Sequence, residues 1–194
     1  MFDSEKYLSV ISIFLICFSL VISGIITYYL YNFLKQKAIA SKIRKSMFGI
    51  IFSIIGVGFI FALAGTIIYQ TSNNDLSGKI QKYLIATNVI SFSLILIAIA
   101  VLFTFVHNIA IKLTDDSILY LGEKINYSDI AKIIIDPSNG NLYINYKVPR
   151  TYKRIRYISN CSFKKLIIDN ASKLNLEIIN DDANKYFEKL TGKN

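Results

Sequence analysis

Three long stretches without charged side chains dominate the N-terminal part of the chain. Asp, Glu, Lys and Arg are absent between Lys6 and Lys35, between Lys45 and Asp75 and between Lys82 and Lys112. A helix needs about 20 predominantly apolar residues to cross the hydrocarbon core of a bilayer, and each stretch exceeds this length. The pattern therefore predicts a transmembrane domain over 1–112, with three α-helices spanning about 7–34, 47–69 and 83–111.

From residue 113 onward the hydrophobic pattern has a shorter period. Apolar residues alternate with others in 142–148, and the segments 118–121, 124–127, 129–136 and 152–159 have the composition of further strands. The intervening sequence DPSNG at 136–140 favours a hairpin, because Asn and Gly tolerate positive φ. Apolar positions recur every three or four residues in 163–174, which predicts an amphipathic helix. A short strand at 176–179 and a last helix from 183 complete a predicted small α+β domain over 113–194, an antiparallel sheet plus helices.

Composition agrees with a membrane protein. Apolar residues make up 53% of the chain, charged residues only 18%, and the mean hydropathy is +0.44. These values argue against a soluble enzyme, a secreted disulfide scaffold and a disordered chain. The first apolar stretch is about twice as long as the apolar core of a signal peptide and has no basic head, so we interpret it as a retained anchor.

The basic residues predict how the helices are oriented. Seven of them fall in the first loop or just after the third span, and three fall on the opposite side. Basic residues in short loops favour the cytoplasmic face. We therefore expect a multi-pass protein of the cell membrane with its N-terminus outside and its C-terminal domain in the cytoplasm. The seven are Lys35, Lys37, Lys42, Arg44, Lys45, Lys112 and Lys124, and the three are Lys6, Lys79 and Lys82.

Two polar residues of the third span are costly in a bilayer. Asn88 favours a hydrogen bond between helices. His107, the only histidine, lies about four residues from the predicted inner end, where water and headgroups reach it. We interpret it as an interfacial histidine with a satisfied ring. A proton relay or metal ligand is the alternative, although no carboxylate lies in any span.

The second span is rich in small residues at helical spacing. Such residues let another helix backbone approach closely, either within the three-helix domain or between copies of the chain in an oligomer. Both interpretations stay open. The predicted helix-packing residues are Gly49, Ser53, Gly58, Ala62 and Thr66.

One short motif and the order of predicted elements resemble a known family. The sequence INYSDI at 125–130 leads into a hydrophobic strand, a hairpin, a basic strand and an amphipathic helix. This order resembles the bacterial pleckstrin-homology-like (PH-like) domain of small YcxB-type membrane proteins, over roughly residues 117–174. The resemblance implies a binding or scaffolding module and transfers no functional residues. The sequence departs from it by having five predicted strands before the helix, where a full barrel of this kind has seven.

A run of basic residues around the last predicted strand of the sheet is the strongest candidate binding surface. Held near an anionic leaflet, each basic residue contributes about 1 kcal/mol to docking. The plainer interpretation is an exposed edge strand that its charges protect against unwanted pairing. The domain's net charge of only +3 predicts no nucleic-acid partner. The residues are Lys147, Arg150, Lys153, Arg154 and Arg156.

No motif in the chain points to catalysis. Phosphate-binding Gly-rich loops, nucleophile elbows, HExxH sequences and paired cysteines are all missing from the sequence. We therefore predict no catalytic, cofactor-binding or metal-binding residues. The expected function is a non-enzymatic, membrane-tethered PH-like module that binds anionic inner-leaflet lipids or a protein partner. The alternative is a helical component acting through its spans, such as an oligomeric transporter subunit or an immunity-type protein.

Overall fold

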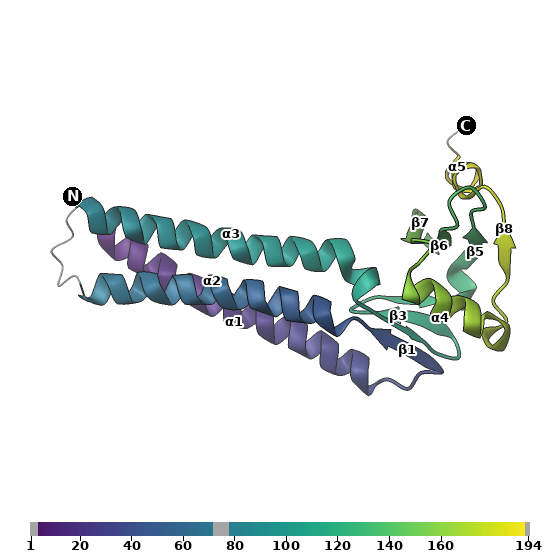
Figure 1. Cartoon of the computed structure of the whole chain (residues 1–194), viewed down its shortest axis with the longest axis horizontal. Helices are drawn as coiled ribbons and strands as arrows, with labels where there is room; N and C mark the ends of the chain where they lie inside the picture. The colour runs from purple at the N-terminus through teal and green to yellow at the C-terminus, as the bar shows by residue number, and fades with distance from the viewer. Residues whose placement is uncertain (1–3, 72–77, 193–194) are drawn as a thin grey trace. The chain divides into compact units, whose positions relative to one another are not determined.

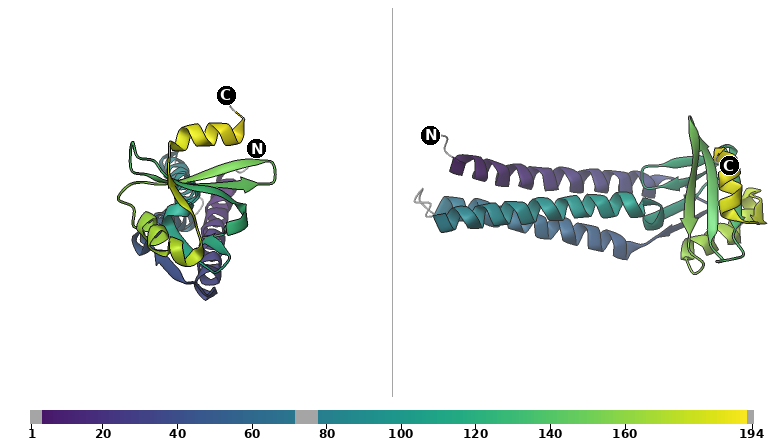
Figure 2. Two further views of the ribbon diagram at one scale, coloured as in Figure 1. Left: turned by 90° about the vertical axis from the view of Figure 1, so that its right-hand side faces the viewer. Right: turned by 90° about the horizontal axis from the view of Figure 1, so that it is seen from above.

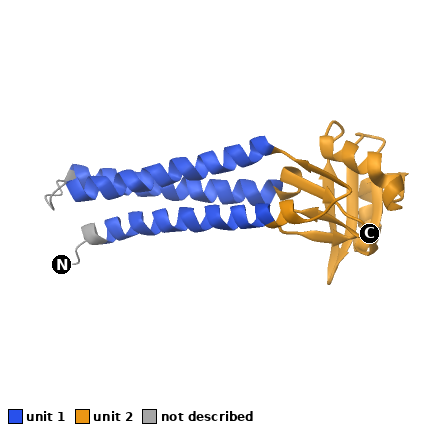
Figure 3. Ribbon diagram, turned by 90° about the horizontal axis from the view of Figure 1, so that it is seen from below, with its two compact units in different colours: residues 1–31, 45–105 blue, residues 32–44, 106–194 orange. Residues whose placement is uncertain are grey.

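The chain folds into two compact units. The computed structural model describes residues 4–71 and 78–192. One unit contains the described residues up to 31 together with 45–105, and the second contains 32–44 together with the residues from 106 onward (Figure 3). We refer to them as the helical unit and the C-terminal unit. The chain passes from one unit to the other three times.

Three long helices supply the helical unit. They are α1 (Ser4–Lys35), α2 (Lys45–Thr71) and α3 (Gly78–Ile109), shown in Figure 1. The stretches long and apolar enough to cross a membrane are Tyr7–Lys35, Lys45–Thr71 and Lys79–Ile109. These bounds agree with the three predicted spans to within a few residues, which confirms that part of the predicted fold. The chain thus has the architecture of a multi-pass membrane protein.

One face of α2 packs inside the helical unit. Its buried positions are spaced three or four residues apart, as expected for one side of a helix. Ala62 is fully buried in a cluster with Leu15 of α1 and Ile95 of α3. The absence of a side chain at Gly58 lets the backbone of α3 come close. A Cβ there would lie 3.3 Å from the Ser91 carbonyl oxygen. The buried positions are Phe48, Ile51, Ile55, Gly58, Ala62 and Gly65.

Asn88 joins two helices, as predicted. Its side-chain amide donates to the Leu8 carbonyl oxygen at 3.0 Å, and its Oδ1 accepts from the Ser12 hydroxyl at 2.7 Å. Gly65 of α2 leaves room for this contact, since a Cβ there would lie 2.9 Å from Ser12 Oγ. The apolar helices are therefore linked by buried hydrogen bonds as well as by packing.

The C-terminal unit contains two four-stranded sheets. The first has the order β1-β2-β3-β4 and is antiparallel throughout. The second has the order β7-β6-β5-β8, with β8 parallel to β5 and the other pairs antiparallel. The strands are β1 (Ala40–Ile43), β2 (Ala110–Leu113), β3 (Ser117–Tyr120), β4 (Lys124–Asn126), β5 (Ile130–Ile135), β6 (Leu142–Val148), β7 (Thr151–Tyr157) and β8 (Ile178–Asn180).

Two helices cover different parts of these sheets. The helix α4 (Ser162–Ala171) buries Phe163 and Ile167 in the main core, which also takes residues from both sheets. The helix α5 (Ala183–Thr191) packs with Tyr143 in a separate cluster on the second sheet. Figure 2 shows α4 and α5 as distinct helices of this unit. The predicted small domain of antiparallel strands and helices is thereby confirmed.

The predicted hairpin between β5 and β6 is present. Gly140 has φ +67°, and a Cβ at this position would meet Ser159 Oγ at 2.9 Å. The buried Asp136 side chain accepts from the Ser138 backbone N–H at 2.9 Å. Hydrogen bonds from hydroxyl and amide groups of this turn lower the pKa of Asp136, so the carboxylate stays ionised. Gly140 therefore has the positive φ that the sequence predicted for this turn, and the Asp136 carboxylate adds hydrogen bonds that the sequence analysis did not predict.

The C-terminal unit also includes residues that precede the predicted boundary at residue 112, namely 32–44 and 106–112. It takes β1 from the first interhelical loop and β2 from the residues directly after α3. Each strand has only four residues, and β2 continues the apolar pattern of the third helix. Seven strands therefore precede α4, where the sequence predicted five.

Lys112 of β2 fastens the end of α1 within the C-terminal unit. Its ammonium group donates to the carbonyl oxygens of Leu34 at 3.0 Å and Gln36 at 2.7 Å, and lies 5.1 Å from the centroid of the Phe33 ring. These carbonyls are among those a helix leaves without a partner at its C-terminal end. Lys112 is only 5% exposed, and burial lowers its pKa. A residue counted as part of the positive-inside bias thus has a structural task.

Arg44, which follows β1, holds the other end of the same segment. Its backbone N–H donates to the Ile109 carbonyl oxygen at 2.8 Å. Its guanidinium lies 5.1 Å from the centroid of the Phe163 ring and contacts Cys161 Sγ at 3.4 Å. The 32–44 segment is therefore held at its first end by Lys112 of β2, and at its last end Arg44 attaches it to the end of α3 and the start of α4.

We expect Gly58→Leu to destabilise the helical unit by about 1–3 kcal/mol, because a large side chain must displace the α3 backbone and Leu94. Gly56→Leu is the matched control on the same helix, since a Cβ there meets nothing within 4 Å. Unfolding in mixed detergent micelles, followed by far-UV circular dichroism, measures both. Equal stability of the two variants would contradict the packing described.

We expect Lys112→Met to destabilise the C-terminal unit by about 1–3 kcal/mol, because the carbonyl groups of Leu34 and Gln36 lose a charged donor that is itself buried. Guanidinium unfolding of the full chain, followed by the near-UV circular dichroism of its tyrosines, measures the loss. Lys124→Met removes a lysine whose ion pair with Asp116 is exposed, and serves as the control with the smaller effect. A Lys112→Met chain as stable as the control would show that the fastening of α1 contributes nothing.

Candidate functional site

The β6–β7 hairpin carries the basic residues singled out in the sequence. Lys147 lies near the end of β6, Arg150 lies in the connecting turn, and Lys153 and Arg156 lie on β7. All four of these side chains are exposed. The antiparallel register places Lys153 opposite Tyr146 and Arg156 opposite Tyr143. We call these four residues, Lys147, Arg150, Lys153 and Arg156, the basic hairpin.

The fifth predicted residue, Arg154, has a different environment. Its guanidinium lies between two aromatic rings, 5.0 Å from the centroid of Tyr143 and 4.8 Å from that of Phe187. It donates to the Ala183 carbonyl oxygen at 3.3 Å and to Asn184 Oδ1 at 3.0 Å. Arg154 therefore holds α5 on the second sheet. It differs in this from the four residues of the basic hairpin.

A shallow hollow lies at the turn of this hairpin. Its volume is about 360 Å³, and its lining includes Lys147, Arg150 and Tyr152 from the hairpin with Leu190 and Thr191 from the end of α5. Two cationic side chains therefore border one concave surface. Sequence reasoning missed Leu190 and Thr191 as neighbours of the hairpin, because α4, β8 and most of α5 lie between them and the hairpin along the chain.

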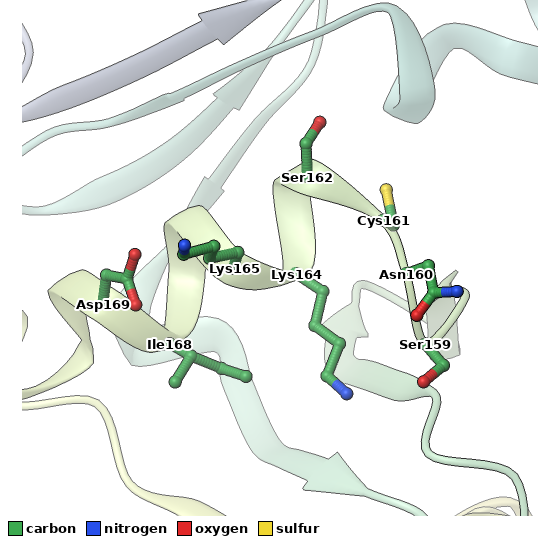
Figure 4. Close-up of a pocket in the computed structure, with 8 residues that line it drawn as sticks. All are labelled: Ser159, Asn160, Cys161, Ser162, Lys164, Lys165, Ile168 and Asp169. Atoms are coloured by element: carbon green, nitrogen blue, oxygen red, sulfur yellow. The ribbon is translucent and has the colours of Figure 1, made fainter.

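A second hollow of about 400 Å³ lies at the start of α4 (Figure 4). Lys164 and Lys165 contribute to its lining, together with Ser159 and Ile168. The Lys164 ammonium donates to the Gly140 carbonyl oxygen at 2.6 Å, so this cation fastens the β5–β6 turn to the helix. The sequence analysis did not single out these residues.

The predicted helix-packing residues differ in how deeply they are buried. Gly58 and Ala62 are buried in the seam of the helical unit, whereas Gly49 and Ser53 are exposed. Thr66 is half-buried and donates to the Ala62 carbonyl oxygen at 3.2 Å. Packing within the three helices therefore accounts for two of the five positions directly.

His107 has a partner that sequence reasoning missed. Its Nε2 lies 2.7 Å from Oε2 of Glu123, which follows β3, and its ring meets that of Tyr120 edge-on with 4.8 Å between centroids. Glu123 Oε1 also accepts from the Tyr146 hydroxyl at 3.0 Å. The sequence analysis looked for carboxylates inside the spans only, and Glu123 lies 16 residues further along. The partner that the sequence analysis expected for the histidine ring is thus present at Nε2.

Core tyrosines complete this cluster. The Tyr157 hydroxyl lies 3.0 Å from the Tyr120 hydroxyl and 3.2 Å from the His107 carbonyl oxygen. Burial raises the pKa of Tyr120 and of Tyr157, and burial with the Glu123 carboxylate raises that of Tyr146. All three phenols therefore keep their protons at neutral pH; Tyr146 and Tyr157 act as hydrogen-bond donors, and the Tyr120 hydroxyl accepts from Tyr157.

In the part of the chain that the structure describes, no three His, Cys, Asp or Glu side chains gather in a way that could hold a metal ion. Cys17 and Cys161 are both free thiols, one in each unit.

Comparison with known proteins gives one match. The model of a family described as "Uncharacterised protein YtsF" matches residues 116–186, which lie within the C-terminal unit. No curated protein and no solved structure matches the chain. The matched region runs from the loop before β3 into α5 and includes the whole basic hairpin.

Proposed function

We propose that the protein is a membrane-tethered binding module whose basic hairpin docks on anionic lipid headgroups. In this proposal the C-terminal unit is a PH-like domain without chemistry of its own, and it faces the cytoplasm. The observation that carries the proposal is the exposure of four cationic side chains on one hairpin. The fifth basic residue, Arg154, is used within the fold.

The order of strands supports the PH-like part of the proposal. A full barrel of this kind has seven strands before its helix. In the C-terminal unit, β1 to β4 form one antiparallel sheet, β5 to β7 form the antiparallel part of the other, and α4 follows. The two strands that the sequence analysis lacked are β1 and β2. The strand β8 and the helix α5 remain additions to that pattern.

Electrostatics supports a lipid partner over a neutral one. Basic side chains gain about 1 kcal/mol each near an anionic leaflet, and the gain falls away within a Debye length. A free domain would lose this small gain to the entropy of association. Here the unit is continuous with three apolar helices, so the hairpin already has a high effective concentration at the bilayer.

The direct test places the full chain in nanodiscs and follows amide exchange at Arg150 in the hairpin turn and at Thr151, the first residue of β7. We expect exchange to slow when phosphatidylglycerol replaces part of the phosphatidylcholine, because docking buries the turn. Lys147→Gln with Lys153→Gln removes two of the four charges. At about 1 kcal/mol each, this weakens docking ~30-fold and abolishes the slowing.

The matched control removes two exposed lysines elsewhere in the same unit, with Lys165→Gln and Lys173→Gln. This control lowers the net charge equally and leaves the hairpin intact, so the slowing should persist. Equal exchange in neutral and anionic nanodiscs would overturn the proposal. Equal slowing of amide exchange in the two double variants would overturn it as well. If the hairpin amides were protected only when a protein is added, the partner would be a protein and the lipid proposal would be wrong.

A further inference from the structure

Three cross-strand pairs of the β6–β7 hairpin lie on one face of the second sheet. Residues opposite each other in an antiparallel pair point to the same face, and so do residues two apart along a strand. Tyr143 on this face packs with Ala183, at the start of α5. Leu190, near the end of α5, borders the same hollow as Lys147. The helix α5 therefore lies along this face. The pairs are Tyr143–Arg156, Asn145–Arg154 and Lys147–Tyr152.

This face carries three cations on successive pairs. Lys147 and Arg156 are exposed, whereas Arg154, which lies between them, is half-buried and contacts α5 through the Phe187 ring. The helix thus holds the middle cation of the row. If α5 lifted from the sheet, the three cations would form one continuous cationic surface.

The hydrogen-bond acceptors that hold Arg154 under α5 are neutral. Its guanidinium donates to the Ala183 carbonyl oxygen at 3.3 Å and to Asn184 Oδ1 at 3.0 Å. A phosphate group offers a guanidinium two parallel hydrogen bonds and an opposite charge, which carbonyl and amide oxygens lack. Anionic headgroups therefore compete with α5 for this side chain.

A buried acceptor on the same face lacks a partner. Asn145, opposite Arg154, is fully buried, and its Oδ1 has no hydrogen-bond partner among the described residues. Its amide group donates to the Lys132 carbonyl oxygen at the long distance of 3.5 Å. An unpaired buried acceptor costs free energy, so it disfavours the covered arrangement. Lifting α5 opens this face to water, which can donate to that oxygen.

We infer that α5 is a removable cover, and that Arg154 joins Lys147 and Arg156 in binding anionic lipid phosphates when the cover lifts. The inference rests on the proposed function, because it concerns regulation of the same surface. With nine residues, α5 is too short to be stable alone in water, so it unfolds when it leaves the sheet. One further cation near an anionic leaflet tightens docking about fivefold. By reciprocity, docking raises the population of the lifted state by the same factor.

The first experiment follows amide exchange of α5 in the full chain, reconstituted in nanodiscs. The Tyr186 N–H donates to the Asp182 carbonyl oxygen at 3.0 Å, so its exchange reports whether the helix is folded. We expect this exchange, relative to that of the α4 amides, to quicken about fivefold when phosphatidylglycerol replaces part of the phosphatidylcholine. In Arg154→Gln the change of lipid should leave this relative rate unaltered, because lifting α5 then releases no cation.

The second experiment loosens the cover without touching the basic hairpin. Phe187→Ala removes one of the two rings that hold Arg154, so α5 lifts more readily. The slowing of exchange at Arg150 by phosphatidylglycerol should then increase by up to about fivefold, and Phe187→Ala combined with Arg154→Gln should show no such increase. Ile168→Ala is the matched control, since it shortens an exposed apolar side chain on α4, and it should dock as the wild type does.

The outcomes separate the cover from the proposed function. Slower exchange at Arg150 in anionic nanodiscs, with no change at Tyr186, would overturn the cover and leave lipid docking by the hairpin standing. Docking of Phe187→Ala that is no tighter than that of Ile168→Ala would also overturn the cover. Equal exchange at Arg150 in neutral and anionic nanodiscs would overturn the proposed function, and the cover with it. If Phe187→Ala fails to fold, exchange at Tyr186 in the wild type still decides.

Discussion

The pairing of β1 with β2 is the interaction on which the rest of the structure depends. The strand β1 lies between the first two helices and β2 follows the third, yet their four residue pairs stand in one antiparallel ladder. A sheet cannot form across a bilayer, so both segments lie on the same side of any membrane that the helices span. The pairing agrees with the part of the predicted topology that places the first loop and the C-terminal region together.

This pairing gives two of the basic residues predicted on the inner side individual roles. Lys112 and Arg44 are committed to Leu34, Gln36 and Phe163 inside the C-terminal unit. A positive-inside count treats such residues as equivalent charges, whereas the fold uses some as fasteners. The same distinction separates Arg154, held between two rings, from the exposed residues of the basic hairpin. While α5 covers the sheet, our proposal assigns the exposed residues of the basic hairpin, and not Arg154, to binding of anionic lipid headgroups.

How much the sequence predicts depends on how local the determining interactions are. The helices follow from charge-free windows, and β5 and β6 follow from alternation with an Asn–Gly turn between them. The strands β1 and β2 are too short for a periodic signal, and only their mutual pairing makes them strands. The contacts of Glu123 could not be predicted for the same reason, because its hydrogen bonds to His107 and Tyr146 span 16 and 23 residues. Long-range contacts of single residues leave no pattern in one sequence.

Amide exchange in the 39–44 segment of the membrane-embedded full chain tests the central claim most directly. The backbone N–H groups of Ile39 and Arg44 donate at 2.8 Å to the carbonyl oxygens of Leu113 and Ile109. If this segment is a strand of the sheet, its amides exchange as slowly as those of β2 and β3, because all of them open together. Exchange of these amides at the rate of an unstructured loop, with β2 and β3 still protected, would contradict the account.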